Sequence, residues 1–200
     1  MARVRKSIVA TLTLLVHSTC VHADTFSENG TITISWKGVN GLSKKSYSAP
    51  NVTSDCKKYS ICNNFDNYPT DLAQWALKKL RTKYNLEKYT MERKAVVRDE
   101  EIFQLCPSKG EIIFPTTALS NLNEEWYFIL NLPDYNFQGY HVNKCDNISS
   151  SCQGLSSSKS SECEQVYTDR RMFYFDLKEQ FVSNKNIFKV PSCCSCAVYF

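Results

Sequence analysis

The chain ends in KVPSCCSCAVYF, which places three cysteines, Cys193, Cys194 and Cys196, within four residues. Such a cluster constrains the fold strongly, because cysteines this close are normally held in disulfides, bound to a metal ion or kept as reactive thiols. The full sequence of 200 residues contains 10 cysteines. This content is typical of proteins that fold in an oxidising compartment, where disulfides persist.

The N-terminus has the pattern of a secretory signal peptide. Three basic residues in MARVRK precede the short, mostly apolar run 7–16, and VHA at 21–23 carries the small residues that signal peptidase recognises. We predict that residues 1–23 are a signal peptide cleaved after Ala23 and that the mature protein is secreted and extracellular. The apolar run is shorter than the roughly 20 residues of a membrane-spanning helix, so we expect no membrane insertion. The expected N-glycosylation sites on this route are the Asn-X-Ser/Thr triplets at Asn29, Asn51 and Asn147.

Charge divides the rest of the chain into two regions of opposite sign. Residues 24–98 contain 13 Lys/Arg and 7 Asp/Glu, a net charge of +6, whereas residues 99–200 contain 8 Lys/Arg and 13 Asp/Glu, a net charge of −5. A uniformly basic chain would indicate a nucleic-acid or membrane partner. This pattern instead predicts two segments that attract each other, and we expect no nucleic-acid partner.

The first region is predicted to be mostly flexible, with one helix. Residues 24–54 are polar and rich in Ser, Asn, Gly and Thr, a composition typical of flexible segments. In YPTDLAQWALKKLRTKYNLEK, Pro69 precedes a helical pattern that Thr70 or Asp71 can cap. The apolar residues of this pattern recur at helical spacing and form one face, made of Leu72, Trp75, Ala76, Leu80 and Tyr84. The helix is either an ordinary surface helix or, as we favour, one that needs a partner surface, because the region has little core of its own.

A polar tether, TMERKAVVRDEEIFQLC, joins the two regions. It contains the dibasic pair Arg93-Lys94 and also Arg98, which is followed by three acidic residues. Exposed polar tethers are where proteolysis concentrates. The position of this tether, at the charge boundary and just before the cysteine-rich region, favours a cleavage site.

The second region is predicted to be an antiparallel β protein. Alternating or aromatic-rich runs are joined by Pro, Gly, Ser and Asn segments, a pattern typical of strands and turns. The runs are EIIFPTTALS, EEWYFILNL, GYHVNKC, EQVYTDRRMFYFDL and NIFKVPSCCSCAVYF. In EEWYFILNL, residues of even number from Trp126 to Leu132 would share one face and Tyr127, Ile129 and Asn131 the other. About 100 residues of twisted hairpins bury only a thin core, so cross-links or oligomerisation must add stability.

The sequence contains few residues and motifs that could bind a metal ion or catalyse a reaction. His141 is the one histidine left after removal of the signal peptide, although zinc sites commonly combine histidine with cysteine. No Gly-X-Ser-X-Gly or His-Glu-X-X-His motif is present. We therefore expect no metal ion, no cofactor and no catalytic residue, and a protein that is not an enzyme.

Disulfides remain as the role of the terminal cysteines. Side chains alternate between the two faces of a strand, so Cys194 and Cys196 should point one way and Cys193 the other. Cys145 and Cys152, seven residues apart, are natural partners for Cys194 and Cys196, and two such bonds would close a covalent ring.

One cysteine is then left over. Cys106 and Cys163 would form a third bridge, which leaves Cys193 on the opposite face. An odd cysteine in a secreted protein suggests an intermolecular bond, here to Cys193 of a second copy across a two-fold axis. The sequence alone leaves the exact connectivity open.

Several stretches resemble the Spätzle family, the secreted ligands of Toll receptors in arthropods. In the second region they are LCPSKGEIIFPTTALSNLNEEWYFILN, KCDNISSSCQ and FKVPSCCSCAVYF. Upstream, CKKYSICNNFDNYPTDLAQWAL resembles the Cys…Cys…Asp-X-Tyr-Pro stretch of Spätzle prodomains. The resemblance covers roughly residues 55 to 200, a span consistent with one prodomain and one ligand domain. The Pro-Ser-Cys-Cys-X-Cys ending is its most specific part.

The resemblance implies a fold and a set of disulfides. Residues 99–200 would form an all-β, neurotrophin-like cystine-knot domain of twisted antiparallel hairpins, preceded by a prodomain over residues 24–98. The implied ring consists of Cys145–Cys194 and Cys152–Cys196, threaded by Cys106–Cys163, while Cys56–Cys62 closes a prodomain loop and Cys193 forms the interchain bond of a homodimer.

The resemblance also implies partners. A clip-domain serine protease would cut the proprotein after an arginine, and Arg98, eight residues before Cys106, fits best. Because the following Asp-Glu-Glu is more acidic than we would expect at a protease subsite, Lys94 is the second choice. The cut, disulfide-linked dimer would bind the ectodomain of a Toll-family receptor.

The sequence thus predicts the secreted proprotein of a Spätzle-like cytokine that acts in innate immune or developmental signalling. In the uncut protein the basic prodomain would cover the acidic ligand region, helped by the apolar helix face. Two related alternatives are a neurotrophin-like growth factor for another receptor and a coagulogen-like clotting protein, which assembles after cleavage. A protease inhibitor and a secreted scaffold without a signalling role are the more distant ones.

Overall fold

Strands dominate the structure, a computed structural model that describes residues 30–86, 89–91, 104–155 and 160–199, with the backbone alone for 89–91. In chain order the elements are β1 Thr33–Ser35, α1 Ser54–Tyr59, β2 Ile61–Cys62, α2 Thr70–Tyr84, β3 Tyr89–Met91, β4 Ser108–Ile113, β5 Thr117–Leu119, β6 Trp126–Ile129, β7 Gln138–Cys145, β8 Ser160–Arg171, β9 Tyr174–Asp176, β10 Phe181–Ser183 and β11 Ile187–Tyr199. We call residues 30–86 the cover segment and the described residues of 104–199 the knot half. The predicted β-rich region, preceded by a segment with a long helix, is confirmed.

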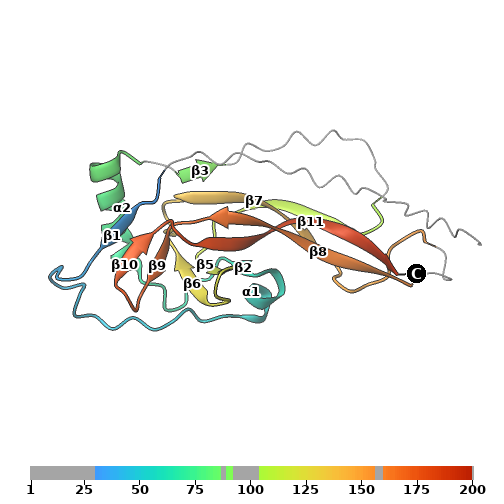
Figure 1. The fold of residues 1–200 in the computed structure, drawn as a ribbon, viewed down its shortest axis with the longest axis horizontal. Helices are drawn as coiled ribbons and strands as arrows, with labels where there is room; N and C mark the ends of the chain where they lie inside the picture. Colours follow the sequence, from blue (N-terminus) through green and yellow to red (C-terminus); the bar gives the residue numbers. More distant parts are fainter. Residues whose placement is uncertain (1–29, 87–88, 92–103, 156–159, 200) are drawn as a thin grey trace, which may run out of the picture.

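A six-stranded sheet joins the cover segment to the knot half. Its strand order is β1-β10-β9-β6-β5-β2, so the cover segment supplies both edge strands. Strand β1 pairs antiparallel with β10, and β2 pairs antiparallel with β5. Figure 1 shows this sheet with α2 at one end of an elongated molecule, from which β8 and β11 extend toward the other end. The two regions of opposite charge therefore share one sheet.

Side chains of this sheet alternate between two hydrophobic clusters, one on each face. Phe128 of β6 and Leu130 just after it belong to the cluster under α2, whereas Ile129 belongs to the cluster on the other face. Strand β9 alternates in the same way, with Phe175 toward α2 and Tyr174 away from it. Residues of β7 and β11 complete the second cluster, so both faces of the sheet are buried. The two-faced pattern predicted for EEWYFILNL is confirmed, although the strand itself ends at Ile129.

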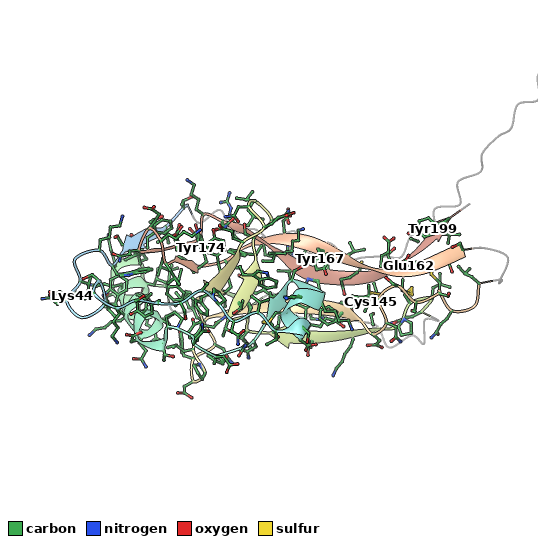
Figure 2. The ribbon with its side chains drawn as sticks, turned by 90° about the horizontal axis from the view of Figure 1, so that it is seen from below. Lys44, Cys145, Glu162, Tyr167, Tyr174 and Tyr199 are labelled. Atoms are coloured by element: carbon green, nitrogen blue, oxygen red, sulfur yellow. A yellow bond between two sulfur atoms is a disulfide. The ribbon has the colours of Figure 1, made fainter. Side chains whose placement is uncertain are left out.

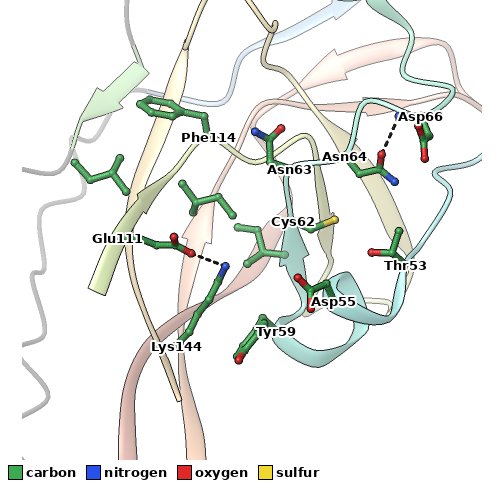
Figure 3. A pocket seen from close by; sticks show the side chains of 13 residues that line it. Thr53, Asp55, Tyr59, Cys62, Asn63, Asn64, Asp66, Glu111, Phe114 and Lys144 are labelled. Carbon is green, nitrogen blue, oxygen red and sulfur yellow. Dashed lines mark hydrogen bonds and ion pairs between the residues drawn. The ribbon is translucent and has the colours of Figure 1, made fainter. Parts of the chain in front are cut away.

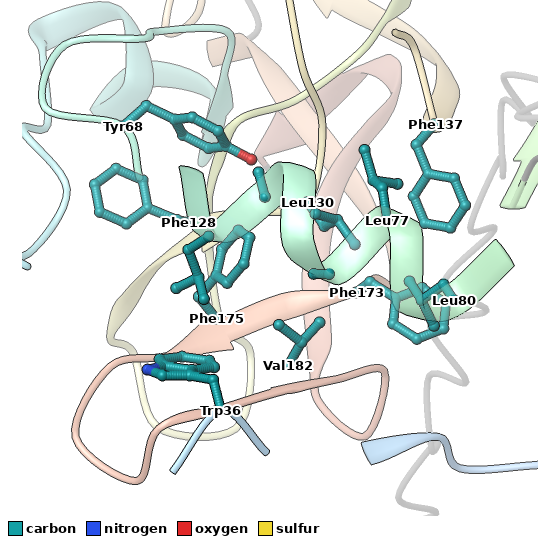
Figure 4. Close-up of a cluster of buried hydrophobic side chains, with 13 residues drawn as sticks. Trp36, Tyr68, Leu77, Leu80, Phe128, Leu130, Phe137, Phe173, Phe175 and Val182 are labelled. Carbon is teal, nitrogen blue, oxygen red and sulfur yellow. The ribbon is translucent and has the colours of Figure 1, made fainter. Parts of the chain in front are cut away.

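Helix α2 buries its apolar face against the knot half, as its sequence pattern predicts. Leu72, Ala76 and Leu80 are 0% exposed and pack with knot-half aromatics in the first cluster (Figure 4). Pro69 precedes the helix and offers no side-chain cap, while the carboxylate of Asp71 in the first turn accepts the backbone N–H of Leu72 at 2.8 Å. An acidic group in this turn is favourable because it complements the helix dipole. The partner surface that this helix needs is thus the core of the knot half.

The beginning of the cover segment is more ordered than its composition predicts. Strand β1 lies within the stretch 24–54 that we expected to be flexible, and Trp36 directly after it is 1% exposed. The ring of Trp36 contacts the ring of Phe175 edge-on, with 6.4 Å between the centroids. The structure differs from the expectation here because composition averages over a whole stretch, whereas a few apolar residues suffice to dock it.

The cover segment also contains a second, short helix that the sequence pattern did not predict. In α1 the side-chain oxygen of Thr53 accepts the backbone N–H of Cys56 at 3.3 Å, an ordinary N-cap. The helix ends at Tyr59 and is followed by Ser60, whose φ of 62° is left-handed, and the disulfide Cys56–Cys62 closes the turn into β2. A six-residue helix needs such supports, because isolated helices of this length are unstable.

Strands β8 and β11 form a long antiparallel ribbon. The register runs from Ile187 opposite Arg171 to Tyr199 opposite Ser160, with a shift between Pro191 and Cys193. Proline lacks an N–H to donate, so an irregularity at this point is expected. Figure 2 shows Tyr199 and Glu162 at the far tip of the ribbon, away from the six-stranded sheet.

The third sheet has the order β3-β7-β4. The side chain of Phe114, next to the end of β4, lies over Gly139 of β7. A Cβ atom at Gly139 would lie 2.6 Å from Cε1 of Phe114. A glycine is therefore needed at this position for β7 and Phe114 to approach each other.

Candidate functional site: the cystine knot and the covered aromatic face

Three disulfides of the knot half form an interlocked arrangement. Cys145–Cys194 and Cys152–Cys196 connect the segments 145–152 and 194–196 into a ring. The third disulfide is Cys106–Cys163. Sγ of Cys106 lies 3.7 Å from Sγ of Cys152, so the third bond passes close to the ring. The structure brings together the same pairs that the resemblance implies, and Cys56–Cys62 forms the predicted loop in the cover segment.

The knot sits where the ribbon meets β7. Cys145 is the last residue of β7, and Cys152 lies in the loop that follows it. Figure 2 shows Cys145 and Tyr167 between the six-stranded sheet and the ribbon tip. The hydrogen-bonded neighbour of β11 is β8, so the two partners of Cys194 and Cys196 come from outside the paired strand. Strand alternation alone would not have identified them.

Gln165 of β8 binds all three strands around the knot, a role that no sequence pattern indicated. Its side-chain oxygen accepts the backbone N–H of Cys145 at 2.9 Å. Its side-chain nitrogen lies 3.0 Å from the carbonyl of Asn143 and 2.9 Å from the carbonyl of Cys193. This one amide therefore links β7 to β11 through β8 and fixes the backbone at Cys193.

A group of sulfur atoms in the knot resembles a metal site only by distance. The Sγ atoms of Cys106, Cys152 and Cys196 lie within 4.8 Å of one another. All three cysteines are in disulfides, and a metal ligand must be a thiolate. This group therefore offers no ligands.

Cys193 lies in β11 directly after the register shift and is 7% exposed. The side chains of Cys194 and Cys196 are in the ring, and alternation along the strand directs Cys193 to the other face. In the structure, which contains one copy of the chain, Cys193 is itself disulfide-bonded, so its interchain bond in a dimer remains a prediction.

The predicted processing sites fall partly outside the described residues. Ala23, Asn29, Lys94 and Arg98 lie there. The two described sequon asparagines, Asn51 and Asn147, are exposed and lie in loops, the first before α1 and the second between Cys145 and Cys152.

The cover segment is anchored most precisely through Tyr68, which is 7% exposed. Its hydroxyl donates to the carbonyl of Ile129 at 2.8 Å and accepts the backbone N–H of Asn131 at 3.0 Å. The ring lies edge-on to Phe128 and Phe175, with centroids 5.5 Å and 6.2 Å away (Figure 4). Burial raises the pKa of Tyr68 far above its usual range, so this hydroxyl stays protonated and can donate.

A second anchor holds α1 near the knot. The hydroxyl of Tyr59 donates to the carbonyl of Cys145 at 2.9 Å, and the hydroxyl of Tyr167 donates to the carbonyl of Lys58 at 3.3 Å. A groove of about 470 Å³ lies beside this contact, between the α1–β2 loop and β4. Figure 3 shows the ion pair of Lys144 and Glu111 in its wall, with 2.7 Å between Nζ and Oε1.

Charged contacts between the cover segment and the knot half lie at the rim. Lys37 pairs with Glu179 at 3.6 Å, and both side chains are more than half exposed. The guanidinium carbon of Arg81 lies 4.0 Å from the centroid of the Tyr135 ring. Lys78 and Lys79 are exposed on the outer side of α2. Exposed ion pairs contribute little, so apolar burial and the two tyrosine anchors hold the cover more than charge does.

Aromatic residues of the knot half differ in how accessible they are to a partner. Phe173 and Tyr174 are 0% and 6% exposed and therefore fill the core, whereas Trp126 and Tyr127 are partly exposed. Across the part of the chain that the structure describes, no helix is long and apolar enough to span a membrane.

Together, the threaded ring of disulfides, the long two-stranded ribbon and the antiparallel hairpins define the class of this domain, which is a cystine-knot ligand fold of the neurotrophin type. The model of the Spaetzle family matches residues 103–198. This part of the chain therefore matches the Spaetzle family, as the resemblance of its motifs indicated.

Individual proteins resemble parts of this chain. The chain is 35% identical to Neurotrophin 1 of Drosophila melanogaster over 94 residues, 47% of this chain and 10% of that protein. It is 28% identical to Protein spaetzle of the same organism over 149 residues, 70% of this chain and 44% of that protein. The match thus spans less than half the length of either relative. Among solved structures, a chain described as the crystal structure of the spatzle cystine knot has 22% identity and a TM-score of 0.30, and the match covers 50% of this chain and 99% of that one.

Proposed function

We propose that this chain is the secreted proprotein of a Spätzle-like cytokine whose cut, disulfide-linked dimer activates a Toll-family receptor. Residues 1–23 would be the signal peptide, 24–98 the prodomain and 99–200 the ligand domain. The observation that carries the proposal is the pairing of a Spaetzle-family knot domain with a preceding segment that covers its aromatic face.

Cleavage would turn the contact between the cover segment and the knot half from an intramolecular into an intermolecular one. In the uncut chain the tether keeps the cover segment at a high effective concentration next to the knot half, and a cut removes that advantage. A clip-domain serine protease would cut after Arg98, with Lys94 as the second choice. Aromatic residues now under α2 would then become accessible, and aromatic side chains are enriched at the centres of protein interfaces.

The ligand would act as a dimer joined through Cys193. Two-fold symmetry lets one residue bond the same residue of a second copy. Glycans at Asn51 and Asn147 would separate on cleavage, the first leaving with the prodomain and the second staying on the ligand. The chain would have no catalytic activity of its own.

The experiment that tests this proposal begins with the mass of the secreted protein, reduced and unreduced, before and after limited cutting by an Arg-specific protease. A covalent dimer that is trimmed to a resistant core starting at Asp99, and that becomes a monomer in Cys193→Ser, is the expected result. A monomeric protein, or one that is cut throughout the knot half, would contradict it. Cys56→Ser/Cys62→Ser is the matched control, because it removes a disulfide that should leave the dimer intact.

Signalling is then tested with the cut dimer on cells that carry a Toll-family receptor and a reporter. The cut wild-type protein should activate the reporter and the uncut protein should not. The coagulogen-like alternative predicts growth of light scattering after cutting, whereas a ligand stays a discrete dimer. The neurotrophin-like alternative predicts a normal dimer that leaves the Toll reporter silent.

A further inference from the structure

The end of β6 and the two residues after it form a polar notch on an apolar face. Strand β6 ends at Ile129, and after it the carbonyl of Ile129 and the N–H of Asn131 both point toward the cover segment, where the Tyr68 hydroxyl meets them. A phenol hydroxyl can donate and accept at the same time, so one group satisfies both backbone atoms.

The shape of the notch is fixed by the knot half alone. The side-chain nitrogen of Asn131 donates to the carbonyls of Pro115 at 2.6 Å and Gln138 at 3.1 Å. Its oxygen accepts the N–H groups of Phe137 at 3.0 Å and Gln138 at 2.8 Å. Gln138 in turn donates to the carbonyls of Leu130 and Phe173 and accepts the N–H of Phe173. None of these partners belongs to the cover segment, so the notch keeps its geometry when the cover leaves.

The walls around the notch suit an aromatic ring. Phe128 and Phe175 lie at 89° and 77° to the plane of Tyr68, which are the edge-on arrangements that aromatic pairs prefer. Both walls are 1% exposed in the uncut chain. A ring between these walls is thus held in the position from which its hydroxyl reaches the notch.

We propose that this notch, framed by Phe128 and Phe175, is a preformed binding site for the phenol of a tyrosine-bearing peptide segment, and that Tyr68 fills it in the uncut chain. The proposal names the contact that holds the cover segment on the knot half. It rests on the proposed function only in that cleavage in the tether is the event that empties the site. A partner ring without a hydroxyl leaves the Ile129 carbonyl and the Asn131 N–H without a hydrogen bond from that ring, so the site favours tyrosine over phenylalanine.

The first test compares Tyr68→Phe with Tyr84→Phe in the full-length chain. Tyr84 packs against the same cluster, but its hydroxyl makes no hydrogen bond with a described residue. Tyr84→Phe therefore removes one oxygen atom, as Tyr68→Phe does, without removing a hydrogen bond. After cutting in the tether, the cover fragment of Tyr68→Phe should dissociate on the order of 10-fold faster than wild type, and that of Tyr84→Phe within about 2-fold. Equal rates for the two variants would overturn the proposal.

Two further measurements separate this proposal from the proposed function. In the uncut chain, hydrogen exchange at the Asn131 amide should accelerate in Tyr68→Phe, while the Ile129 amide, which donates to the carbonyl of Thr116, should not. This result needs neither cleavage nor a receptor. A synthetic peptide of residues 63–86 should also displace the cover from cut wild-type protein at a concentration roughly 10-fold lower than the same peptide with phenylalanine at position 68. Equal potency of the two peptides, or an unchanged Asn131 amide, would remove the notch as a tyrosine site.

Discussion

Cys196 of β11 lies directly opposite Cys163 of β8 in the register of the ribbon, yet the two residues are not bonded to each other. Cys196 bonds Cys152 and Cys163 bonds Cys106, which are partners outside the ribbon. The knot thus depends on two bonds that bypass the nearest strand neighbour. Correct pairing needs the whole domain to fold, because the ribbon alone would favour a different bond.

This relationship predicts the result of removing one cysteine. In Cys106→Ser the thiol of Cys163 is freed opposite the Cys152–Cys196 bond, and thiolates exchange with nearby disulfides. We expect non-native Cys163–Cys196 pairing in a measurable share of the secreted Cys106→Ser protein, detected by non-reducing peptide mapping. The double variant Cys106→Ser/Cys163→Ser has no such thiol and should keep both ring disulfides. An absence of rearranged bonds in the single variant would show that the ring is closed to exchange.

Removal of Gln165 should destabilise the knot half without changing any disulfide. Gln165→Leu leaves the N–H of Cys145 and the carbonyl of Cys193 without their partner, and unsatisfied buried groups cost about 1–3 kcal/mol each. Urea unfolding of the unreduced protein should therefore give a free energy of unfolding lower by about 1–3 kcal/mol for each of these two groups. Gln153→Leu, at an exposed glutamine in the loop beyond Cys152, is the control and should change it little. A Gln165→Leu protein as stable as the control would mean that water or relaxation replaces these bonds.

Gln165 and Tyr68 illustrate which parts of the site the sequence could predict. The face of α2, the alternation in EEWYFILNL and the opposite orientation of Cys193 and Cys194 follow from local periodicity, which the sequence displays directly. Gln165 and Tyr68 each act through hydrogen bonds to backbone groups, and the partners of Tyr68 are 61 and 63 residues away. No periodic pattern marks such a residue, because its role depends on where distant segments end in space.

The docking of β1 was unpredictable for a related reason. A three-residue strand with one apolar residue has no period to read, and its polar surroundings dominate the composition. The disulfide pairs came from the resemblance to a family, since the residues alone allow many connectivities.

Trp36 should be essential for holding β1 on the sheet. Its side chain is 1% exposed in a cluster that both parts of the chain form, and truncating a buried aromatic to alanine costs about 3–5 kcal/mol. In Trp36→Ala we expect rapid hydrogen exchange in β1 and a lower free energy of unfolding. Lys37→Ala, the neighbouring control, removes only the exposed pair with Glu179 and should cost less than about 1 kcal/mol. If β1 stays protected from hydrogen exchange in Trp36→Ala, its pairing with β10 holds it on the sheet without the Trp36 side chain.

The contact between the loop 45–47 and α2 should weaken at both extremes of pH. Burial tends to raise the pKa of the Asp71 carboxyl, but the hydrogen bonds from Lys45, the Leu72 N–H and Tyr47 together hold it below its usual value. The stabilising contribution of the Asp71 carboxylate is therefore present above its unfolded pKa of about 3.9 and is lost as pH falls through its lower pKa in the folded protein. Burial, and then the Asp71 charge, raises the pKa of Tyr47 to about 12. The stabilising contribution of the Tyr47 hydroxyl is therefore present below its unfolded pKa of about 10 and is lost as pH rises through the folded pKa.

Hydrogen exchange around Tyr47 as a function of pH, corrected for intrinsic rates, would measure this window. Protection should be constant from about pH 5 to pH 9 and should fall outside it. Asp71→Asn should lose the acidic limb of the profile, because position 71 no longer titrates. A wild-type profile without an acidic limb would mean that the carboxylate contributes nothing to the loop contact.

Charge reversal on α2 should act mainly through Arg81 rather than through its lysine neighbours. Arg81 lies over the Tyr135 ring of the knot half, and a cation–π contact of this kind is worth about 0.5–1 kcal/mol at an exposed site. Arg81→Glu should therefore speed dissociation of the cut cover fragment by roughly 2- to 5-fold. Lys79→Glu makes the same change of charge at an exposed position, and its smaller effect should disappear in high salt, where long-range attraction is screened. Equal effects of both variants, abolished together by salt, would instead favour the net charges of the two regions as the force that retains the cover.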